Sequence, residues 1–170
     1  MPYAVTHVLL TIILVDLFRD YFMKKRHKRY LTLHTIFIAG VAGLLPDMDI
    51  FLGWIFNSEL LIHGGIFHTP LFGLIFLIPA IILWKQRKNK IAVYFFIITF
   101  GILFHIFLDY LLGGANHYGI MPFWPLSTMR FNINMLSMIG LKQVPMILDA
   151  VILLGWLWHE EIKHKIKDFI

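Results

Sequence analysis

The chain has 170 residues, of which 59% are hydrophobic, and a mean hydropathy of +0.75. Soluble domains are usually about 45–50% apolar, so the composition favours an integral membrane protein, which we expect to form one all-α domain over residues 1–170. The chain has no cysteine, which excludes disulfides, thiolate metal sites and cysteine nucleophiles. Its net charge of +5 comes from basic residues that flank apolar runs, so we expect the bilayer rather than nucleic acid as its partner.

Apolar runs of spanning or nearly spanning length follow one another along the chain. They cover residues 3–22, 31–45, 68–84, 91–112 and 144–158. A membrane-crossing helix needs roughly 20 residues, with about 17 at the low end. The second and fifth runs are shorter, so neighbouring residues must extend them if they are to cross. We therefore expect a polytopic bundle of about five transmembrane helices. The apolar stretch 50–56 is too short to cross and should form a re-entrant or interfacial turn.

The basic residues predict the orientation of this bundle. They cluster at residues 24–29, 85–90 and 163–167. Five alternating crossings place all three clusters on one side, and an excess of Lys and Arg marks the cytoplasmic side. We expect a multi-pass protein of the cell membrane with its N-terminus outside and its C-terminus inside.

Ionisable side chains are predicted to gather at the outer end of the bundle. They are His7, Asp47, Asp49, Glu59, His63, His68, His105, Asp109, His117 and Asp149. A bilayer penalises such groups, so they are seldom placed there without a task. Converging histidines and aspartates are the donors of a metal site. The roles of His117 and Asp149 stay open, since Asp149 either supports the site or pairs with Arg130 or Lys142.

Two local patterns carry most of this prediction. His105 and Asp109 are four residues apart, which on a helix puts them on one face about 6 Å apart along the axis. They can share a metal, Asp109 can orient His105, or the pair is only a structural hydrogen bond.

Asp47 and Asp49 follow Pro46 with the alternate spacing of an extended segment, which puts both carboxylates on one side. Close like charges invite a cation or a shared proton, although solvated acids after a helix end are the plainer alternative.

Three histidines complete the pattern. Gly64 and Gly65 follow His63 and allow a tight backbone that turns both His63 and His68 inward. His7 lies near the outer start of the first run, where an isolated histidine would usually be interfacial. Beside the acids, all three are candidate ligands.

These motifs, in this order, resemble the family of inner-membrane metal-dependent hydrolases whose best-known bacterial members are LexA-regulated. The matching residues are Thr6-His7, Leu45-Pro46-Asp47-Met48-Asp49, His63 with His68, His105 with Asp109, and Trp124-Pro125. The chain departs from the family pattern at three positions. The family's Arg after the first His of its His-Arg-Gly element is Gly64 here, its Thr before the second His is Phe67, and its His after the paired acids is Ile50. The missing Arg would weaken the binding of a phosphate.

The resemblance extends distantly to zinc-dependent phospholipase C, a helical protein with His and Asp around a zinc cluster. It implies a membrane-bound hydrolase-like domain that cleaves a phosphoester of a lipid or other amphiphile with metal-activated water. The implied ligands of a divalent metal, most suitably zinc, are His7, Asp47, Asp49, His63, His68, His105 and Asp109. The implied catalytic residues are Asp47, Asp49, His105 and Asp109, on the extracytoplasmic side.

Two alternatives stay open at this point. Paired intramembrane acids with histidines also suit a membrane transporter that binds cations or protons. The missing Arg would equally suit a hydrolase-like scaffold without activity.

Overall fold

The computed structural model describes residues 4–23, 30–56, 63–113, 119–141, 144 and 146–164. Within these residues the regular structure is helical, and the one β-type contact is an isolated antiparallel bridge between Ile120 and Phe131. The all-α fold predicted from the sequence is therefore confirmed for the described part of the chain.

Helices form where the sequence has its apolar runs. They are α1 (Ala4–Leu17), the π-helical η1 (Phe18–Phe22), α3 (Leu33–Ala42), α4 (Met48–Phe56), the 3-10 turn η3 (Ile66–His68), α5 (Pro70–Ile75), α6 (Leu77–Lys85), α7 (Asn89–Leu112), α8 (Met135–Met138) and α9 (Met146–His164). The run 31–45 gives only the ten residues of α3. Tight turns replace the helix from Gly43 onward, because a residue before a proline disfavours helical backbone and Pro46 follows closely.

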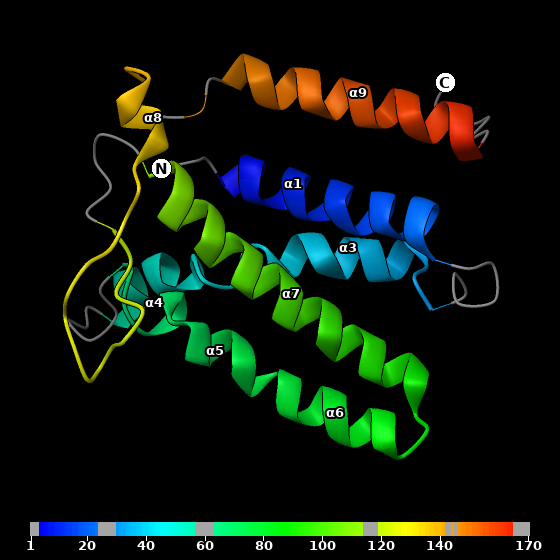
Figure 1. Ribbon diagram of the computed structural model, residues 1–170, viewed down its shortest axis with the longest axis horizontal. Coiled ribbons are helices and arrows are strands. Elements are labelled where there is room, and N and C mark those ends of the chain that lie inside the picture. Colours follow the sequence, from blue (N-terminus) through cyan, green and yellow to red (C-terminus); the bar gives the residue numbers. More distant parts are fainter. Residues whose placement is uncertain are drawn as a thin grey trace.

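The long helices alternate in direction along the long axis of the molecule. In Figure 1, α1, α5–α6 and α9 run one way, whereas α3 and α7 run the other way. Helices α3 and α7 pack closely, because a Cβ built on Gly101 of α7 would lie 2.6 Å from the Cβ of Ala42 in α3. Small residues at helix crossings are a common device of membrane proteins. This crossing positions α7 for its role in the site.

The evidence for membrane crossing is strongest for α7. Among the described residues it is the one helix that is long and apolar enough to cross a bilayer by length and composition. The apolar stretches Leu33–Ala42 and Pro70–Lys85 are shorter. Large apolar side chains are exposed on the outer faces, for example Ile78 at 61% and Leu154 at 65%, as expected of a lipid-facing surface. A helical membrane fold is supported, and the count of five crossings stays a prediction.

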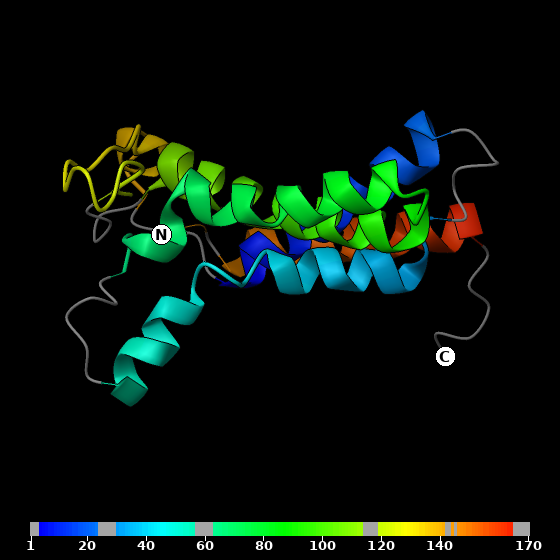
Figure 2. The same cartoon turned by 90° about the horizontal axis from the view of Figure 1, so that it is seen from below.

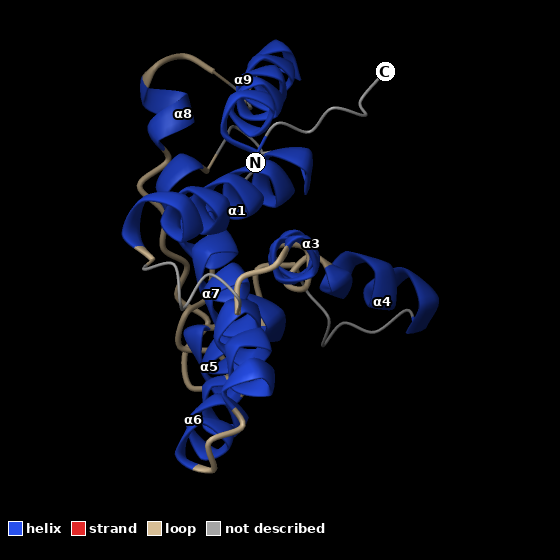
Figure 3. Ribbon diagram, turned by 90° about the vertical axis from the view of Figure 1, so that its right-hand side faces the viewer, coloured by secondary structure: helices blue, strands red, loops and turns tan. Residues whose placement is uncertain are grey.

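Residues 50–56 do not form the turn that their shortness suggested. They make up most of α4, a nine-residue helix that projects away from the other helices (Figures 2 and 3). Its apolar side chains are largely exposed, with Trp54 at 81% and Phe56 at 67%. A nine-residue helix is too short to cross a bilayer, so α4 is suited to lie along an interface.

Candidate metal centre

The predicted ligands meet at one end of the bundle, where α1 begins and α3 and α7 end (Figure 1). They are His7, Asp47, Asp49, His63, His68, His105 and Asp109. All are nearly inaccessible except Asp47 and His63, whose side chains are 19% and 28% exposed. Glu59 and His117, the weaker candidates, lie outside the described residues. The predicted convergence is therefore present in the fold.

Helix α7 contributes the pair that the helical spacing predicted. Nε2 of His105 lies 3.3 Å from Oδ2 of Asp109. On the other side of the ring, Nδ1 of His105 donates to the carbonyl oxygen of Gly43 at 2.7 Å. This hydrogen bond leaves Nε2 of the neutral ring with a free lone pair, as in most metal-binding histidines.

The start of α1 contributes His7. Its Nε2 lies 3.3 Å from Oδ1 of Asp109, and its ring stacks on His105 with centroids 3.8 Å apart. The preceding Thr6 donates its hydroxyl to both oxygens of Asp149, at 2.9 and 3.0 Å. Asp149 is therefore bonded to Thr6, the residue next to His7, and no ion pair joins it to Arg130. Its other predicted partner, Lys142, lies outside the described residues.

The paired acids do not lie on an extended segment, and that expectation is wrong. Asp47 lies in a turn and Asp49 in the first turn of α4, because the chain after Pro46 already folds back as a helical turn, with the Asp49 amide donating to the Pro46 carbonyl. Acids are favoured at the N-terminal end of a helix dipole, so α4 itself stabilises them. The two carboxylates therefore face different partners.

Asp47 faces the ring atoms that lack hydrogen bonds. Its Oδ1 lies 3.5 Å from Nε2 of His105 and 3.8 Å from Nε2 of His68. Asp49 instead faces Nδ1 atoms, with His63 donating to its Oδ1 at 3.0 Å and Nδ1 of His68 lying 3.0 Å from its Oδ2. One carboxylate thus orients two imidazoles.

Charge pairing at Asp49 and His68 outweighs the effect of burial. Burial alone would raise the pKa of Asp49, but its interactions with His63 and His68 lower it to about 2. Burial alone would lower the pKa of His68, but Asp109 and Asp49 raise it to about 9. Both values describe the metal-free chain, in which His68 carries a proton at neutral pH.

In His68 and His105 the two ring nitrogens make contacts of different length. The Nδ1 contacts of 2.7 to 3.0 Å are hydrogen-bond lengths, whereas the Nε2 contacts of 3.3 to 3.8 Å are longer than good hydrogen bonds. Two donors held at about 2.0–2.1 Å by one tetrahedral zinc ion lie roughly 3.3 Å apart. Nε2 of His7, His68 and His105 and both oxygens of Asp109 are buried without a hydrogen-bond partner. The donor set therefore fits zinc.

The donors fall into two adjoining groups. His7, His105 and Asp109 form one group, and Asp47, His63 and His68 form the other, each with candidate ligand atoms within 4.8 Å of one another. Oδ2 of Asp109 also lies 3.5 Å from Nε2 of His68 in the second group. The arrangement can hold two neighbouring ions with a shared carboxylate.

A second buried ionisable cluster lies at the far end of α1. Arg19 lies 2.6 Å from Asp16 and 3.1 Å from Asp20. Helix α9 adds His159 and Glu160, at 3.5 Å from Asp20 and 3.8 Å from Arg19. Trp156 of α9 also donates to Asp16 at 3.1 Å. Sequence patterns did not reveal the α9 residues, because their packing partner is distant in the chain.

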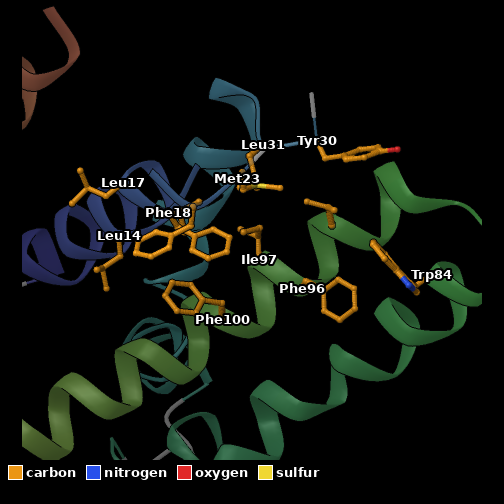
Figure 4. A pocket seen from close by; sticks show the side chains of 13 residues that line it. Leu14, Leu17, Phe18, Met23, Tyr30, Leu31, Trp84, Phe96, Ile97 and Phe100 are labelled. Carbon is orange, nitrogen blue, oxygen red and sulfur yellow. The ribbon is translucent and has the colours of Figure 1, made fainter. Parts of the chain in front are cut away.

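An apolar groove of about 890 Å³ lies between α1, η1, α6 and α7 (Figure 4). Its walls include Leu14 and Phe18 on one side and Phe96 and Phe100 on the other, with Trp84 at one edge. None of the candidate ligands lines it. The groove is therefore separate from the metal centre.

A family model described as YdjM inner membrane protein matches residues 1–165. The match covers nearly the whole chain, so the protein belongs to this family and is a membrane protein. No curated protein and no solved structure matches the chain. The family description confirms the inner-membrane part of the resemblance, and hydrolase activity stays a prediction.

Proposed function

We propose that this inner-membrane protein is a metal-dependent hydrolase that cleaves a phosphoester of a lipid or other amphiphile, with zinc as its metal. The observation that carries the proposal is the set of buried Nε2 and carboxylate oxygen atoms that lie 3.3 to 3.8 Å apart and have no hydrogen-bond partner. Buried polar atoms without partners are costly, and a bound cation would remove that cost.

The side chains divide into ligands and one positioning group. His7, His105 and Asp109 would hold one ion, and Asp47, His63 and His68 would hold a second. We assign Asp49 to positioning rather than to ligation, because its two oxygens face the Nδ1 atoms of His63 and His68. Carboxylates that orient ligating histidines are a common part of metal sites.

When bound, zinc would lower the pKa of a water to about 7 and polarise a phosphoryl oxygen. Asp47 is the better candidate for accepting the proton of the attacking water, through Oδ2, because Oδ1 is the oxygen that faces the ring nitrogens and would bind the metal. Its side chain is 19% exposed and so can meet water. Asp49 is a poor base, because its low pKa and its two histidine partners keep it from taking a proton.

The neighbouring structure suits an amphiphilic substrate. The exposed apolar helix α4 begins at the site itself, since Asp49 lies in its first turn. A lipid headgroup would reach the centre while its tails stay in the bilayer beside α4. The predicted clustering of basic residues on the cytoplasmic side supports an extracytoplasmic position for this end of the bundle.

The first test measures the zinc content and the hydrolytic activity of the same purified protein. Protein purified in detergent without chelator should contain zinc by elemental analysis and should hydrolyse a short-chain phospholipid or a chromogenic phosphodiester. His105→Ala and Asp109→Ala should fold, lose zinc and lose activity. His34→Ala is the matched control, because His34 is exposed and contacts Tyr94 away from the site. Full zinc occupancy in both site variants would refute the proposal, and zinc without hydrolysis would indicate the inactive scaffold.

The second candidate is a transporter of cations or protons. The buried cluster of Asp16, Arg19 and Glu160 favours it, because ionisable groups then occur at both ends of α1. Uptake of zinc into proteoliposomes, lost in Asp16→Asn, would support transport. Zinc binding without uptake would favour the hydrolase.

A further inference from the structure

We propose that Arg130 provides an anion subsite beside the metal centre, which receives a negatively charged phosphate oxygen of the substrate. The inference rests on the proposed hydrolase function and extends it, by naming a residue that selects the substrate. Nothing in the sequence motifs pointed to Arg130, which lies 67 residues after His63.

The guanidinium lies over Gly64, the residue that follows the candidate ligand His63. Nη1 of Arg130 donates to the carbonyl oxygen of Gly119 at 3.1 Å. The same Nη1 would lie 3.3 Å from a Cβ built on Gly64, and the Gly119 oxygen would lie 2.9 Å from it. Only a residue without a side chain leaves this space to Arg130.

Backbone hydrogen bonds fix the three segments relative to one another. The amide of Met121 donates to the carbonyl of Gly64 at 2.9 Å. Ile120 and Phe131 exchange two hydrogen bonds of 3.0 and 2.9 Å, which set Arg130 beside Gly119. Gly64 and Gly119 have φ values of +83° and +87°, which favour glycine. Arg130 is therefore held next to the centre by backbone structure rather than by chance contact of a side chain.

The remaining donors of Arg130 suit a phosphate. A guanidinium has five N–H donors in a planar fork that matches two phosphate oxygens. Among the described residues, Gly119 is its one hydrogen-bond acceptor, and no carboxylate pairs with it. The side chain is also exposed, so a ligand can reach it.

Charge balance favours the same ligand. Two divalent ions would bring four positive charges, and the carboxylates of Asp47, Asp49 and Asp109 would offset three of them. One positive charge would remain, and Arg130 adds a second. A phosphate group carries the complementary charge. Arg130 thus lies against the space that a side chain at position 64 would fill.

The test separates the charge of Arg130 from its backbone contact. Arg130→Gln keeps a polar side chain with an N–H donor but removes the charge, and Arg130→Lys retains the charge but removes the fork. Lys85→Gln, at the far end of α6, is the matched control for loss of one positive charge. Zinc content, thermal stability and binding of inorganic phosphate to the zinc-loaded protein are measured for each, together with kcat and KM for a phosphodiester.

The expected result is unchanged zinc content and stability in Arg130→Gln, with phosphate binding and kcat/KM lowered about 10- to 100-fold, as for loss of a charge-assisted hydrogen-bond pair. Arg130→Lys should recover part of both, and Lys85→Gln should match the unchanged protein. Equal phosphate binding in Arg130→Gln, or loss of its zinc, would overturn the subsite while leaving the hydrolase proposal intact. Absence of zinc from the unchanged protein would overturn both.

Discussion

His105 donates its Nδ1 proton to the carbonyl oxygen of Gly43 at 2.7 Å, which joins the last third of α7 to the end of α3. The last carbonyls of a helix have no partner within the helix, and this one is satisfied by the imidazole. The end of α3 therefore sets the direction in which Nε2 of His105 points. The site depends on how closely the two helices cross.

That dependence predicts the effect of Gly101→Ala. The new Cβ would lie 2.6 Å from the Cβ of Ala42 and 3.1 Å from backbone atoms of α3, so the helices must separate. Overpacking of this kind costs about 1–3 kcal/mol, and the longer distance between His105 and Gly43 should weaken zinc binding. Thermal unfolding in detergent and a zinc competition titration measure both effects. Gly155→Ala is the matched control, because its Cβ would meet nothing within 4 Å. Equal behaviour of the two variants would contradict the prediction.

Asp49→Asn should weaken zinc binding without removing a ligand. An asparagine has one acceptor oxygen, so it cannot serve the Nδ1 groups of both His63 and His68, and its amide would face one of them donor to donor. Loss of such an orienting group typically costs about 10- to 100-fold in metal affinity. A titration against a chromogenic chelator measures the change. Asp149→Asn, which can still accept from Thr6, should bind zinc normally. A complete loss of one zinc ion in Asp49→Asn would show that Asp49 is a ligand after all.

Zinc binding should release protons at neutral pH. The pKa of His68 in the metal-free chain is raised from 6.5 to about 9, so its ring is protonated at pH 7, whereas a zinc-bound ring is neutral. Affinity should therefore rise with pH, by up to about tenfold per pH unit for one released proton, and level off above pH 9. Calorimetry in buffers of different ionisation enthalpy counts the protons. In Asp49→Asn the plateau should begin at lower pH, since one source of the raised pKa is gone. Affinity independent of pH between 7 and 9 would rule out a protonated His68.

Removal of the metal should lower the stability of the whole bundle. The candidate ligands come from α1, from residues 47–68 and from α7, so the folded state would bind zinc far better than the unfolded chain would. A ligand at a thousand times its dissociation constant stabilises a fold by about 4 kcal/mol. Chelation should lower the melting temperature and added zinc should restore it. His105→Ala should melt lower and be insensitive to the chelator. An unchanged melting temperature after complete chelation would exclude a metal that joins these segments.

The sequence was sufficient wherever a local rule decides the geometry. The spacing of His105 and Asp109 needs only the helical period, and the apolar runs predicted where the helices lie. The convergence of the candidate ligands also followed from the sequence, because imidazoles and carboxylates at the ends of apolar runs are costly to bury unless they face one another or a cation. The first two features depend on residues close together in the chain, and the convergence depends on the cost of burying charge.

What the sequence could not supply is the relative direction of side chains from distant segments. The distinct roles of Asp47 and Asp49 depend on α4 starting within the Asp-Met-Asp motif, which a seven-residue apolar stretch did not reveal. The position of Arg130 over Gly64 depends on a bridge between Ile120 and Phe131, and the pairing of Glu160 with Arg19 depends on how α9 packs. None of these contacts has a local signature.

Helix α4 connects the lipid-facing surface of the protein to the candidate metal centre. Its exposed Trp54 and Phe56 are suited to sink among lipid headgroups, while Asp49 at its other end holds the rings of His63 and His68. A rigid tilt of α4 would displace the Asp49 carboxylate and, with it, the imidazoles of His63 and His68. The lipid around α4 would then affect the geometry of the candidate metal centre.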